Sequence, residues 1–226
     1  MEPMAEQLRK AVDTGVTAKD ALAMKYDLAA GKYDEIYDNV GWEDPRMCAQ
    51  VVLDNGFNTG TEILDMGCGT GLVGEHLKTL SGLSDLRLFG CDASDGMLKE
   101  SKKRDIYKEL EQIYLGNFEE FKSNHSCLLN RFDFITASGV MADFHAPSDI
   151  LLEMNSCLKR GGILTLTTRE VYLEDLGYQM IIDDFIDNNE WELMSKRGYE
   201  KFNKTSEKKV GDWHPIPAVH LTFKKL

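Results

Sequence analysis

The stretch EILDMGCGTG, residues 62–71, constrains the fold more strongly than any other part of the chain. Apolar residues run into Asp65, and glycines follow at positions 67, 69 and 71. Glycines between a strand and a helix let the backbone turn tightly and approach a ligand closely. We therefore expect a strand–loop–helix unit of an α/β fold, with a ligand beside the glycine loop.

Strand-like and helix-like segments alternate from residue 62 onward, which predicts a mostly parallel sheet. The predicted strands are residues 62–66, 86–92, 113–116, 132–140 and 163–168. The predicted helices are residues 72–80, 95–110 and 147–158. Two more strands, 191–204 and 218–225, follow without a helix between them, so we expect them to be antiparallel. The sequence predicts a Rossmann-like, seven-stranded, mostly parallel sheet with an antiparallel last strand, helices on both faces and an N-terminal helical cap.

Composition and charge limit the partners that this chain can have. The net charge is −12, and the lysines are scattered among acids. Nucleic-acid binders usually carry a basic patch, so we expect no nucleic-acid partner. No apolar run approaches the ~18–20 residues that cross a bilayer, so we expect no membrane partner. The five cysteines form no CxxC pair, which argues against a metal site and for a reducing, cytoplasmic location.

The glycine loop indicates which ligand the chain binds. Gly67, Gly69 and Gly71 give G-x-G-x-G rather than the dinucleotide pattern G-x-G-x-x-G. Asp65 would repel a pyrophosphate and attract a cation, and S-adenosylmethionine carries an ammonium and a sulfonium but no phosphate. Asp92 follows Gly71 by about 20 residues, the spacing of an acid that binds a ribose. The pattern favours S-adenosylmethionine, although a structural turn and a helix N-terminal acid are the alternative.

The motif ILDMGCGTG resembles the most specific motif of the class I S-adenosylmethionine-dependent methyltransferases. Within that class, the chain is most similar to the Williams–Beuren syndrome chromosome region methyltransferase-like family, from about residue 24 to residue 226. The pieces that carry this likeness are KYDEIYDNVGWEDP, ILDMGCGTGLVGEHL, GCDASDGML, YLGNFEEF and GGILTLTTRE. The resemblance implies a class and a cofactor, and it does not name the methyl acceptor.

The resemblance also implies a set of cofactor-binding residues. The methionine part would be held by Asp65, Gly67, Cys68, Gly69 and Gly71, and the ribose by Asp92. The adenine would be flanked by Ala93, Met97, Asn117 and Phe118. The reactive methyl group would lie next to Ser138, Gly139 and Val140. The family often has an aspartate where Asn117 stands, and an amide offers both a donor and an acceptor there. Tyr33 is implied as a lid aromatic, although a half-buried helix aromatic fits the same pattern.

Four segments are expected beside the cofactor, because ligands in open parallel sheets bind outside the carboxyl ends of the strands. They are the N-terminal cap, the loop 139–147, the segment 169–172 and the loop 203–217. We predict one domain over residues 1–226. Its parts are a helical cap or lid (1–60), a cofactor-binding half (61–170), and a C-terminal helix with the antiparallel strand pair (171–226).

Candidate catalytic and substrate-binding residues lie in these segments. A histidine within reach of the acceptor could act as a base. The candidate bases are His145, with Asp143 near it, and His214. The candidate substrate contacts are Arg169, Tyr172 and Trp213. Each of these side chains has an ordinary surface or strand-end role as its alternative.

The function favoured by the sequence is transfer of a methyl group, by in-line displacement, to a small-molecule acceptor, with S-adenosylhomocysteine as the product. The acidic charge and the small size of the chain agree with a small substrate in a lidded pocket, and we expect a monomer or a weak homodimer. A protein or peptide methyltransferase and a cofactor-binding protein without catalysis remain alternatives. The tetrapeptide SGVM follows the fourth strand where an NPPY-type sequence would indicate methylation of an exocyclic amine.

Overall fold

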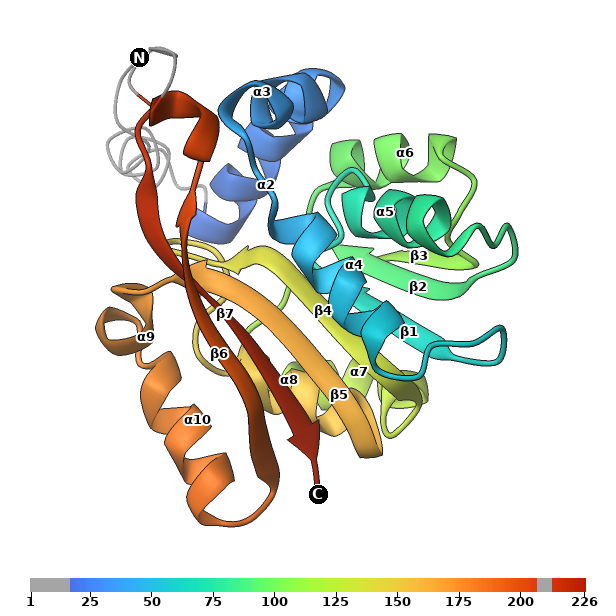
Figure 1. Ribbon diagram of the computed structural model, residues 1–226, viewed down its shortest axis with the longest axis vertical. Helices are drawn as coiled ribbons and strands as arrows, with labels where there is room; N and C mark the ends of the chain where they lie inside the picture. Colours follow the sequence, from blue (N-terminus) through green and yellow to red (C-terminus); the bar gives the residue numbers. More distant parts are fainter. Residues whose placement is uncertain (1–16, 207–212) are drawn as a thin grey trace.

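A seven-stranded sheet is formed in the computed structural model, which describes residues 17–206 and 213–226 (Figure 1). Its strand order is β3-β2-β1-β4-β5-β7-β6. The bounds are β1 Glu62–Met66, β2 Arg87–Asp92, β3 Glu109–Gln112, β4 Phe132–Met141, β5 Leu158–Arg169, β6 Trp191–Lys201 and β7 Ile216–Lys225. Strand β7 pairs antiparallel with both β5 and β6, whereas the other pairs are parallel. The predicted fold class is confirmed.

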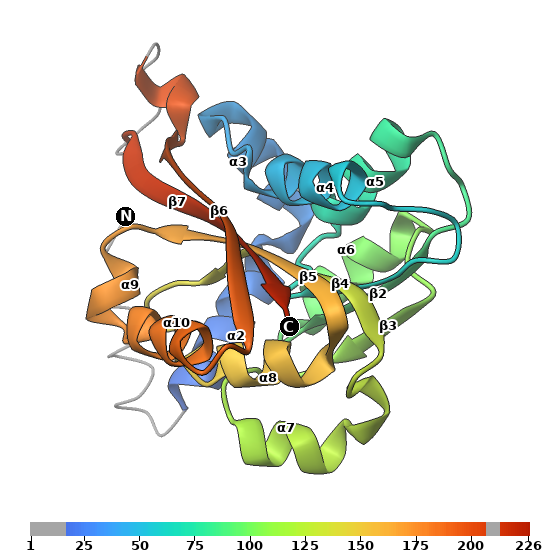
Figure 2. The ribbon, with the colours of Figure 1, turned by 60° about the horizontal axis from the view of Figure 1, so that its bottom comes forward.

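Helices cover both faces of the sheet, with α4 and α5 on one face and α7, α8 and α10 on the other (Figure 2). The helix bounds are α2 Ala18–Ala29, α3 Tyr33–Val40, α4 Asp44–Asp54, α5 Leu72–Ser81, α6 Asp95–Lys103, α7 Phe118–Asn124, α8 Ile150–Cys157, α9 Tyr172–Asp175 and α10 Tyr178–Asp187. Three 3-10 turns are also described: Ala30–Lys32, Ser126–Leu128 and Asn203–Ser206. None of the helices in the described ranges is long and apolar enough to cross a membrane.

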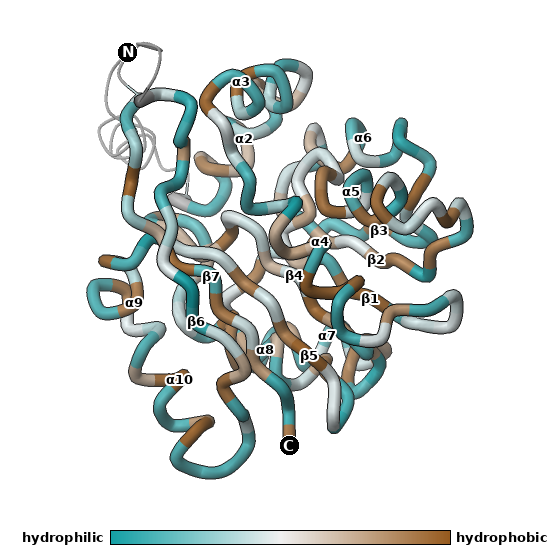
Figure 3. The backbone as a smooth tube through the Cα atoms, viewed as in Figure 1, coloured by the Kyte–Doolittle hydropathy of each residue, from teal (hydrophilic) through white to brown (hydrophobic). Residues whose placement is uncertain are grey.

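The hydrophobic core is split by the sheet into two clusters. Successive residues of a strand point to opposite faces, so Ile63 packs in the cluster under α4 and α5, and Leu64 packs in the cluster under α7 and α8. Phe134 and Ile135 of β4 divide in the same way. Consecutive residues of the central strands are therefore buried, from Ile63 to Met66 in β1 and from Gly162 to Thr168 in β5. Figure 3 shows the hydrophobic segments of these strands in brown, and burial on both faces is typical of a parallel sheet covered by helices.

The third strand is not where the sequence placed it. We predicted a helix through residue 110 and a strand at 113–116, but α6 ends at Lys103 and β3 is Glu109–Gln112. Strand β3 is an edge strand that pairs only with β2, so its polar sequence ELEQ remains largely exposed to solvent. The apolar residues that follow it, Ile113 and Leu115, are buried. Hydrophobicity thus marked the residues after the strand instead of the strand itself.

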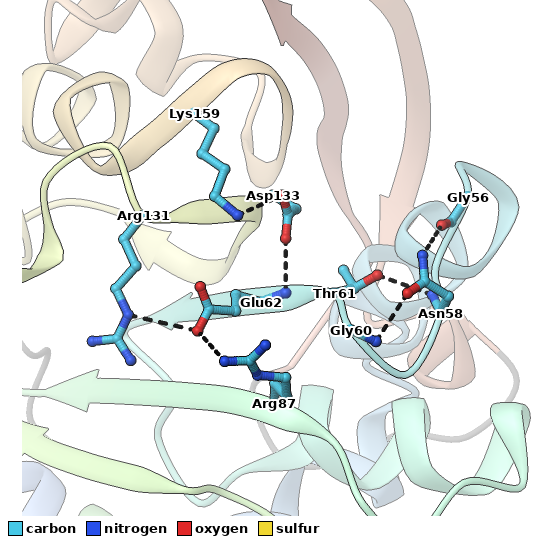
Figure 4. Close-up of polar contacts among 9 residues, drawn as sticks. All are labelled: Gly56, Asn58, Gly60, Thr61, Glu62, Arg87, Arg131, Asp133 and Lys159. Carbon is cyan, nitrogen blue, oxygen red and sulfur yellow. Dashed lines mark hydrogen bonds and ion pairs between the residues drawn. The ribbon is translucent and has the colours of Figure 1, made fainter.

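The amino ends of the central strands are joined by polar contacts, at the edge opposite the carboxyl ends (Figure 4). Asp133 accepts hydrogen bonds from the backbone N–H of Glu62 (2.9 Å) and from Lys159 Nζ (2.8 Å). The Glu62 carboxylate in turn accepts from Arg87 (3.0 Å) and lies 3.9 Å from Arg131. These pairs are partly exposed, so each contributes little stability. They fix how β1 sits between β2 and β4.

Leu64 should be a major contributor to the stability of the sheet. Replacing it by alanine removes a side chain that is 1% exposed, and we expect the free energy of unfolding to fall by about 2–5 kcal/mol. Urea unfolding followed by circular dichroism measures this change. Leu80→Ala is the matched control, because Leu80 is 43% exposed and should change stability by less than about 0.5 kcal/mol. Equal losses in both variants would contradict the assignment of the core.

Candidate functional site

A cavity opens at the carboxyl ends of β1, β2 and β4, beneath the cap helices α2 and α3. Its walls come from the glycine loop after β1, the loop after β2, the segment after β3, the end of β4 and the cap. Most of the predicted site residues lie on these walls. They are Tyr33, Gly67, Cys68, Gly69, Asp92, Ala93, Met97, Ser138, Gly139, Val140 and His145.

The glycine loop adopts a backbone that side chains rarely tolerate, because Gly67, Gly69 and Gly71 all have positive φ (73°, 54° and 90°). The N–H groups of Gly67 and Cys68 both donate to the carbonyl of Cys91 (2.8 and 2.9 Å), which ties the loop to β2. A Cβ on Gly67 would meet Val140 at 2.6 Å, whereas a Cβ on Gly69 would meet nothing within 4 Å. The loop is therefore packed on its protein side and open at Gly69 toward the cavity.

Asp92 links the two loops that flank the cavity. Its Oδ2 accepts from the N–H of Gly69 (2.9 Å), and its Oδ1 accepts from the N–H of Ser94 (2.9 Å). Burial raises the pKa of this carboxyl, and the backbone donors at Ser94 and Gly69 oppose that shift. Ala93 and Met97 follow Asp92 along the cavity wall. Backbone N–H groups hold both Asp92 oxygens, and the carboxylate can still accept a hydrogen bond from a ligand hydroxyl.

Asp65 is fully buried and lies off the cavity wall. Tyr107 donates to its Oδ2 and Thr136 donates to its Oδ1, both at 2.7 Å. Burial raises the pKa of Asp65 to about 6, although these two donors favour the charged form. Its carboxylate therefore anchors the end of β1 to its surroundings. Direct contact between Asp65 and a cationic ligand stays a prediction, because the Asp65 side chain does not line the cavity.

Asn117 and Phe118 also lie off the cavity wall, and Ile113, Tyr114 and Leu115 take that place. Asn117 caps α7 instead: its Oδ1 accepts from the N–H of Glu120 at 3.4 Å. The displacement has the same origin as the misplaced third strand, since the chain reaches the carboxyl edge of the sheet several residues earlier than its hydrophobic pattern indicated.

The end of β4 meets an aromatic residue of the cap that the sequence analysis missed. A Cβ on Gly139 would lie 2.9 Å from the ring of Trp42, so only glycine lets this ring sit against the strand. Trp42 and Ser138 both line the cavity. Trp42 Nε1 and Ser138 Oγ are buried and have no hydrogen-bond partner within the described ranges. Buried polar atoms without a partner are costly, so both atoms are suited to a bound ligand.

Two carboxylates of the cap dock it onto the loops below. Asp27 of α2 accepts from Ser94 Oγ (2.6 Å) and from the N–H of Gly96 (2.7 Å). Asp34 of α3 accepts from Thr70 Oγ1 (2.5 Å) and pairs with Arg104, whose Nε also donates to the carbonyl of Thr70 (2.6 Å). The sequence analysis predicted the cap but not these contacts, which join segments far apart in the chain.

His145 is held on the cavity wall by two hydrogen bonds. Its Nδ1 lies 2.7 Å from the carbonyl oxygen of Asp143, and its Nε2 lies 2.7 Å from the hydroxyl of Tyr26 in α2. Burial lowers the pKa of His145. Asp143 thus contributes its backbone here, and its side chain does not line the cavity. Tyr26 was missed in the sequence, where YDLAAGKYDE singled out Tyr33 alone.

The other candidate substrate residues are not brought to the cavity among the residues that the structure describes. Arg169 donates to the hydroxyl of Tyr172 (3.0 Å) at the end of β5. Trp213 packs edge-on against Phe202, with ring centroids 4.7 Å apart, and His214 beside it is exposed. Residues 207–212 of the predicted loop 203–217, and residues 1–16 of the predicted cap, lie outside the described residues. The described parts contain no cluster of three or more potential metal ligands.

Comparison with known proteins assigns the chain to a family. A family model described as a methyltransferase domain matches residues 57–213. The chain belongs to this family. It is 31% identical over 146 residues to the human methyltransferase-like protein 27, covering 64% of this chain and 56% of that protein. It is 31% identical over 130 residues to the mitochondrial ubiquinone biosynthesis O-methyltransferase of Candida albicans, covering 56% of this chain and 37% of that protein.

Solved structures confirm the fold. A TehB-like SAM-dependent methyltransferase from Corynebacterium glutamicum superposes with a TM-score of 0.55 at 17% identity, covering 88% of this chain and 99% of that one. The predicted class, a class I S-adenosylmethionine-dependent methyltransferase with a Rossmann-like sheet, is confirmed by these matches and by the family assignment. The chain spans only about half of the length of the first of these two curated relatives, and less of the second.

Glu153 should make the stability of this protein depend on pH. It is fully buried, its carboxylate accepts from the N–H groups of Gly116 and Asn117 at 2.9–3.0 Å, and burial raises its pKa to about 7. An acid whose pKa is higher in the folded state holds its proton there, so folding stability falls as pH rises from about 4.5 to about 7.

Glu153→Gln removes this titration and keeps an acceptor oxygen for both N–H groups. Between about pH 5 and about pH 8, the wild type should lose on the order of 1–3 kcal/mol more of its free energy of unfolding than the variant does. Urea unfolding at the two pH values measures the difference. Glu119→Gln, an exposed change on α7, is the control and should leave the pH slope unaltered. The same dependence of the free energy of unfolding on pH in the wild type and in Glu153→Gln would exclude this role of Glu153.

Proposed function

We propose that this protein transfers a methyl group from S-adenosylmethionine to a small-molecule acceptor and releases S-adenosylhomocysteine. The observation that carries the proposal is the open, positive-φ backbone at Gly69 held beside the Asp92 carboxylate at the carboxyl edge of the sheet. A ligand with a ribose and a cationic methionine part suits that pair, whereas the negative charge of Asp65, buried at the end of β1 just before the loop, disfavours a pyrophosphate there. A nicotinamide dinucleotide is accordingly disfavoured.

Each part of the cofactor finds residues of matching chemistry along the cavity. Asp92 would bind the ribose hydroxyls, and Ala93, Met97, Ile113 and Leu115 would form the apolar walls for the adenine. The backbone of the glycine loop would hold the methionine part under Tyr33. When bound, S-adenosylmethionine supplies a methyl group on a sulfonium sulfur to an acceptor that attacks in line with the carbon–sulfur bond. The protein then mainly positions the acceptor and excludes water.

A small acceptor is supported by the cap. Helices α2 and α3 cover the cavity and are docked by Asp27 and Asp34, and three cap aromatics, Tyr26, Tyr33 and Trp42, form its inner surface. Several curated relatives are named as methyltransferases of quinone biosynthesis, among them the demethylmenaquinone methyltransferase of Symbiobacterium thermophilum, which is 29% identical over 143 residues. Membership of the Williams–Beuren-like family is part of this proposal and rests on the motifs quoted from the sequence.

Gly69→Val should abolish binding of S-adenosylmethionine, because the side chain would project into the open space beside the loop and strain a φ of 54°. Isothermal titration calorimetry with S-adenosylmethionine, S-adenosylhomocysteine and NAD measures this, and the wild type should bind the first two and not NAD. Gly198→Val is the control, since Gly198 in β6 has no positive φ and open space around its Cα. Unchanged binding in Gly69→Val would refute the loop assignment.

Asp92→Ala should weaken the binding of S-adenosylmethionine by roughly 5- to 150-fold, because it removes a charged acceptor whose hydrogen bonds to the ribose hydroxyls contribute about 1–3 kcal/mol. The same variant loses its bond to the N–H of Gly69, so circular dichroism must show that the fold is retained. Calorimetry against S-adenosylhomocysteine provides the second measurement. An affinity equal to that of the wild type would place the ribose elsewhere.

A further inference from the structure

The hydrogen bonds of His145 fix where its proton lies. A carbonyl oxygen can only accept, so the contact between His145 Nδ1 and the Asp143 carbonyl at 2.7 Å places a hydrogen on Nδ1. In the neutral ring, Nε2 then carries the lone pair and must accept from the Tyr26 hydroxyl at 2.7 Å. The direction of the chain is therefore Tyr26 O–H to Nε2, and Nδ1–H to the Asp143 carbonyl.

This direction leaves Tyr26 with a free acceptor on the cavity wall. The phenolic oxygen donates its one hydrogen to His145 and keeps its lone pairs for another donor. His145 Nε2 is covered by the Tyr26 hydroxyl, so a ligand cannot reach that nitrogen without displacing it. Any proton that leaves a bound acceptor toward His145 must then pass through the Tyr26 oxygen.

We propose that Tyr26 and His145 form a proton relay that takes the proton from an aromatic hydroxyl group of the methyl acceptor. This inference rests on the proposed methyltransferase function and adds to it a substrate class and a catalytic residue, Tyr26. Tyr26 touches the acceptor, and His145 acts through Tyr26 as a positioning and proton-holding residue.

The step balances without any further reactant. The acceptor O–H gives its proton to the Tyr26 oxygen while the Tyr26 proton passes to His145 Nε2. The acceptor oxygen uses its electron pair to bond the methyl carbon, and the pair of the broken carbon–sulfur bond stays on sulfur. His145 becomes an imidazolium whose Nδ1–H remains bonded to the Asp143 carbonyl, and it returns its proton to solvent after product release.

The cavity favours an aromatic hydroxyl over an amine. An uncharged amine attacks a sulfonium without prior loss of a proton, whereas a phenol gains most of its nucleophilicity by losing one, so a relay serves the phenol. Among the cavity-lining residues that the structure describes, the only carboxylate is Asp92, which is engaged by Gly69 and Ser94, so an ammonium finds no second acid there. Tyr33 and Trp42, whose rings pack edge-on with centroids 6.0 Å apart, form an aromatic surface of the cavity that suits an aromatic acceptor.

Burial and nearby ammonium groups keep His145 in its neutral form. Burial lowers its pKa, and the ammonium groups of Lys25 on α2 and Lys201 on β6 act in the same direction. The Asp143 carbonyl and carboxylate oppose them. From the cap, the Tyr26 ring stands edge-on to the imidazole with centroids 5.6 Å apart. The histidine is therefore neutral at rest and able to take the proton that the relay delivers.

The first test measures the Tyr26–His145 bond independently of activity. Full-length protein labelled with carbon-13 at histidine Cε1 is saturated with S-adenosylhomocysteine, and the His145 signal, assigned by its loss in His145→Gln, is titrated by NMR. The Tyr26 oxygen also accepts from Nε2–H of the protonated ring, and a hydrogen bond to a charged group is the stronger of the two. Tyr26→Phe keeps the aromatic ring but removes this oxygen, so the pKa of His145 should fall by roughly 0.5–1 unit. Tyr114→Phe, which removes another cavity hydroxyl, should cause no shift. An unchanged His145 pKa in Tyr26→Phe overturns the relay.

The second test measures proton transfer with 4-nitrophenol, whose anion absorbs visible light. Protein saturated with S-adenosylhomocysteine should bind the probe at about pH 6 and ionise a larger fraction of it than is ionised in free solution. The phenolate and the imidazolium that form on either side of Tyr26 attract each other, which offsets the lowered basicity of His145. Tyr26→Phe and His145→Gln should bind the probe and leave it neutral. Failure of the wild type to bind or to ionise it, or equal ionisation in Tyr26→Phe, overturns the proposal. Failure to bind S-adenosylhomocysteine at all would instead refute the proposed function.

Discussion

The left-handed backbone of the glycine loop is the constraint on which the site depends. Because Gly67 packs against Val140 and donates to the carbonyl of Cys91, the loop is locked onto β2 and β4 at once. That lock directs the N–H of Gly69 at the Asp92 carboxylate and leaves open space on the other side. A side chain at these positions would have to adopt a strained φ, so the loop shape is specified by residue type alone.

Three carboxylates, Asp27, Asp34 and Asp92, hold the loops and the cap of the site together. Asp92 joins the two loops that flank the cavity, and Asp27 and Asp34 attach the cap to those same loops. In each case the acid accepts from backbone N–H or hydroxyl groups, with a single arginine at Asp34. Hydrogen bonds to charged acceptors are the stronger kind, and their direction fixes position as well as energy. Several of the acids behind the net charge of −12 therefore have a specific structural role.

Features that depend on residues close together in the sequence could be predicted. They are the turn after β1, the alternation of apolar strands and helices, and the reversal between β6 and β7, because each shows in a local sequence pattern. The loop residues and the end of β4 followed from that pattern and from the resemblance. Strand β3 was misplaced because an edge strand pairs on one side only and does not need apolar residues.

The pairing of Tyr26 with His145 could not be predicted, because 119 residues separate them and the contact exists only once the cap has docked. The same holds for Trp42 against Gly139, where a glycine in a strand was the only available signal. Asp65 was predicted from the motif as a ligand contact, and that contact stays a prediction. Its hydrogen bonds to Tyr107 and Thr136 are internal and could not be predicted, because these partners lie far away in the sequence.

Two neighbouring residues of α2 make contacts in different directions. Asp27 accepts from Ser94 and Gly96, and Tyr26 meets His145. Any displacement of this helix from the loop after β2 would therefore also separate the Tyr26 hydroxyl from the imidazole. The arrangement of the Tyr26–His145 pair is in this way coupled to the docking of the cap, since one short helix carries both sets of contacts.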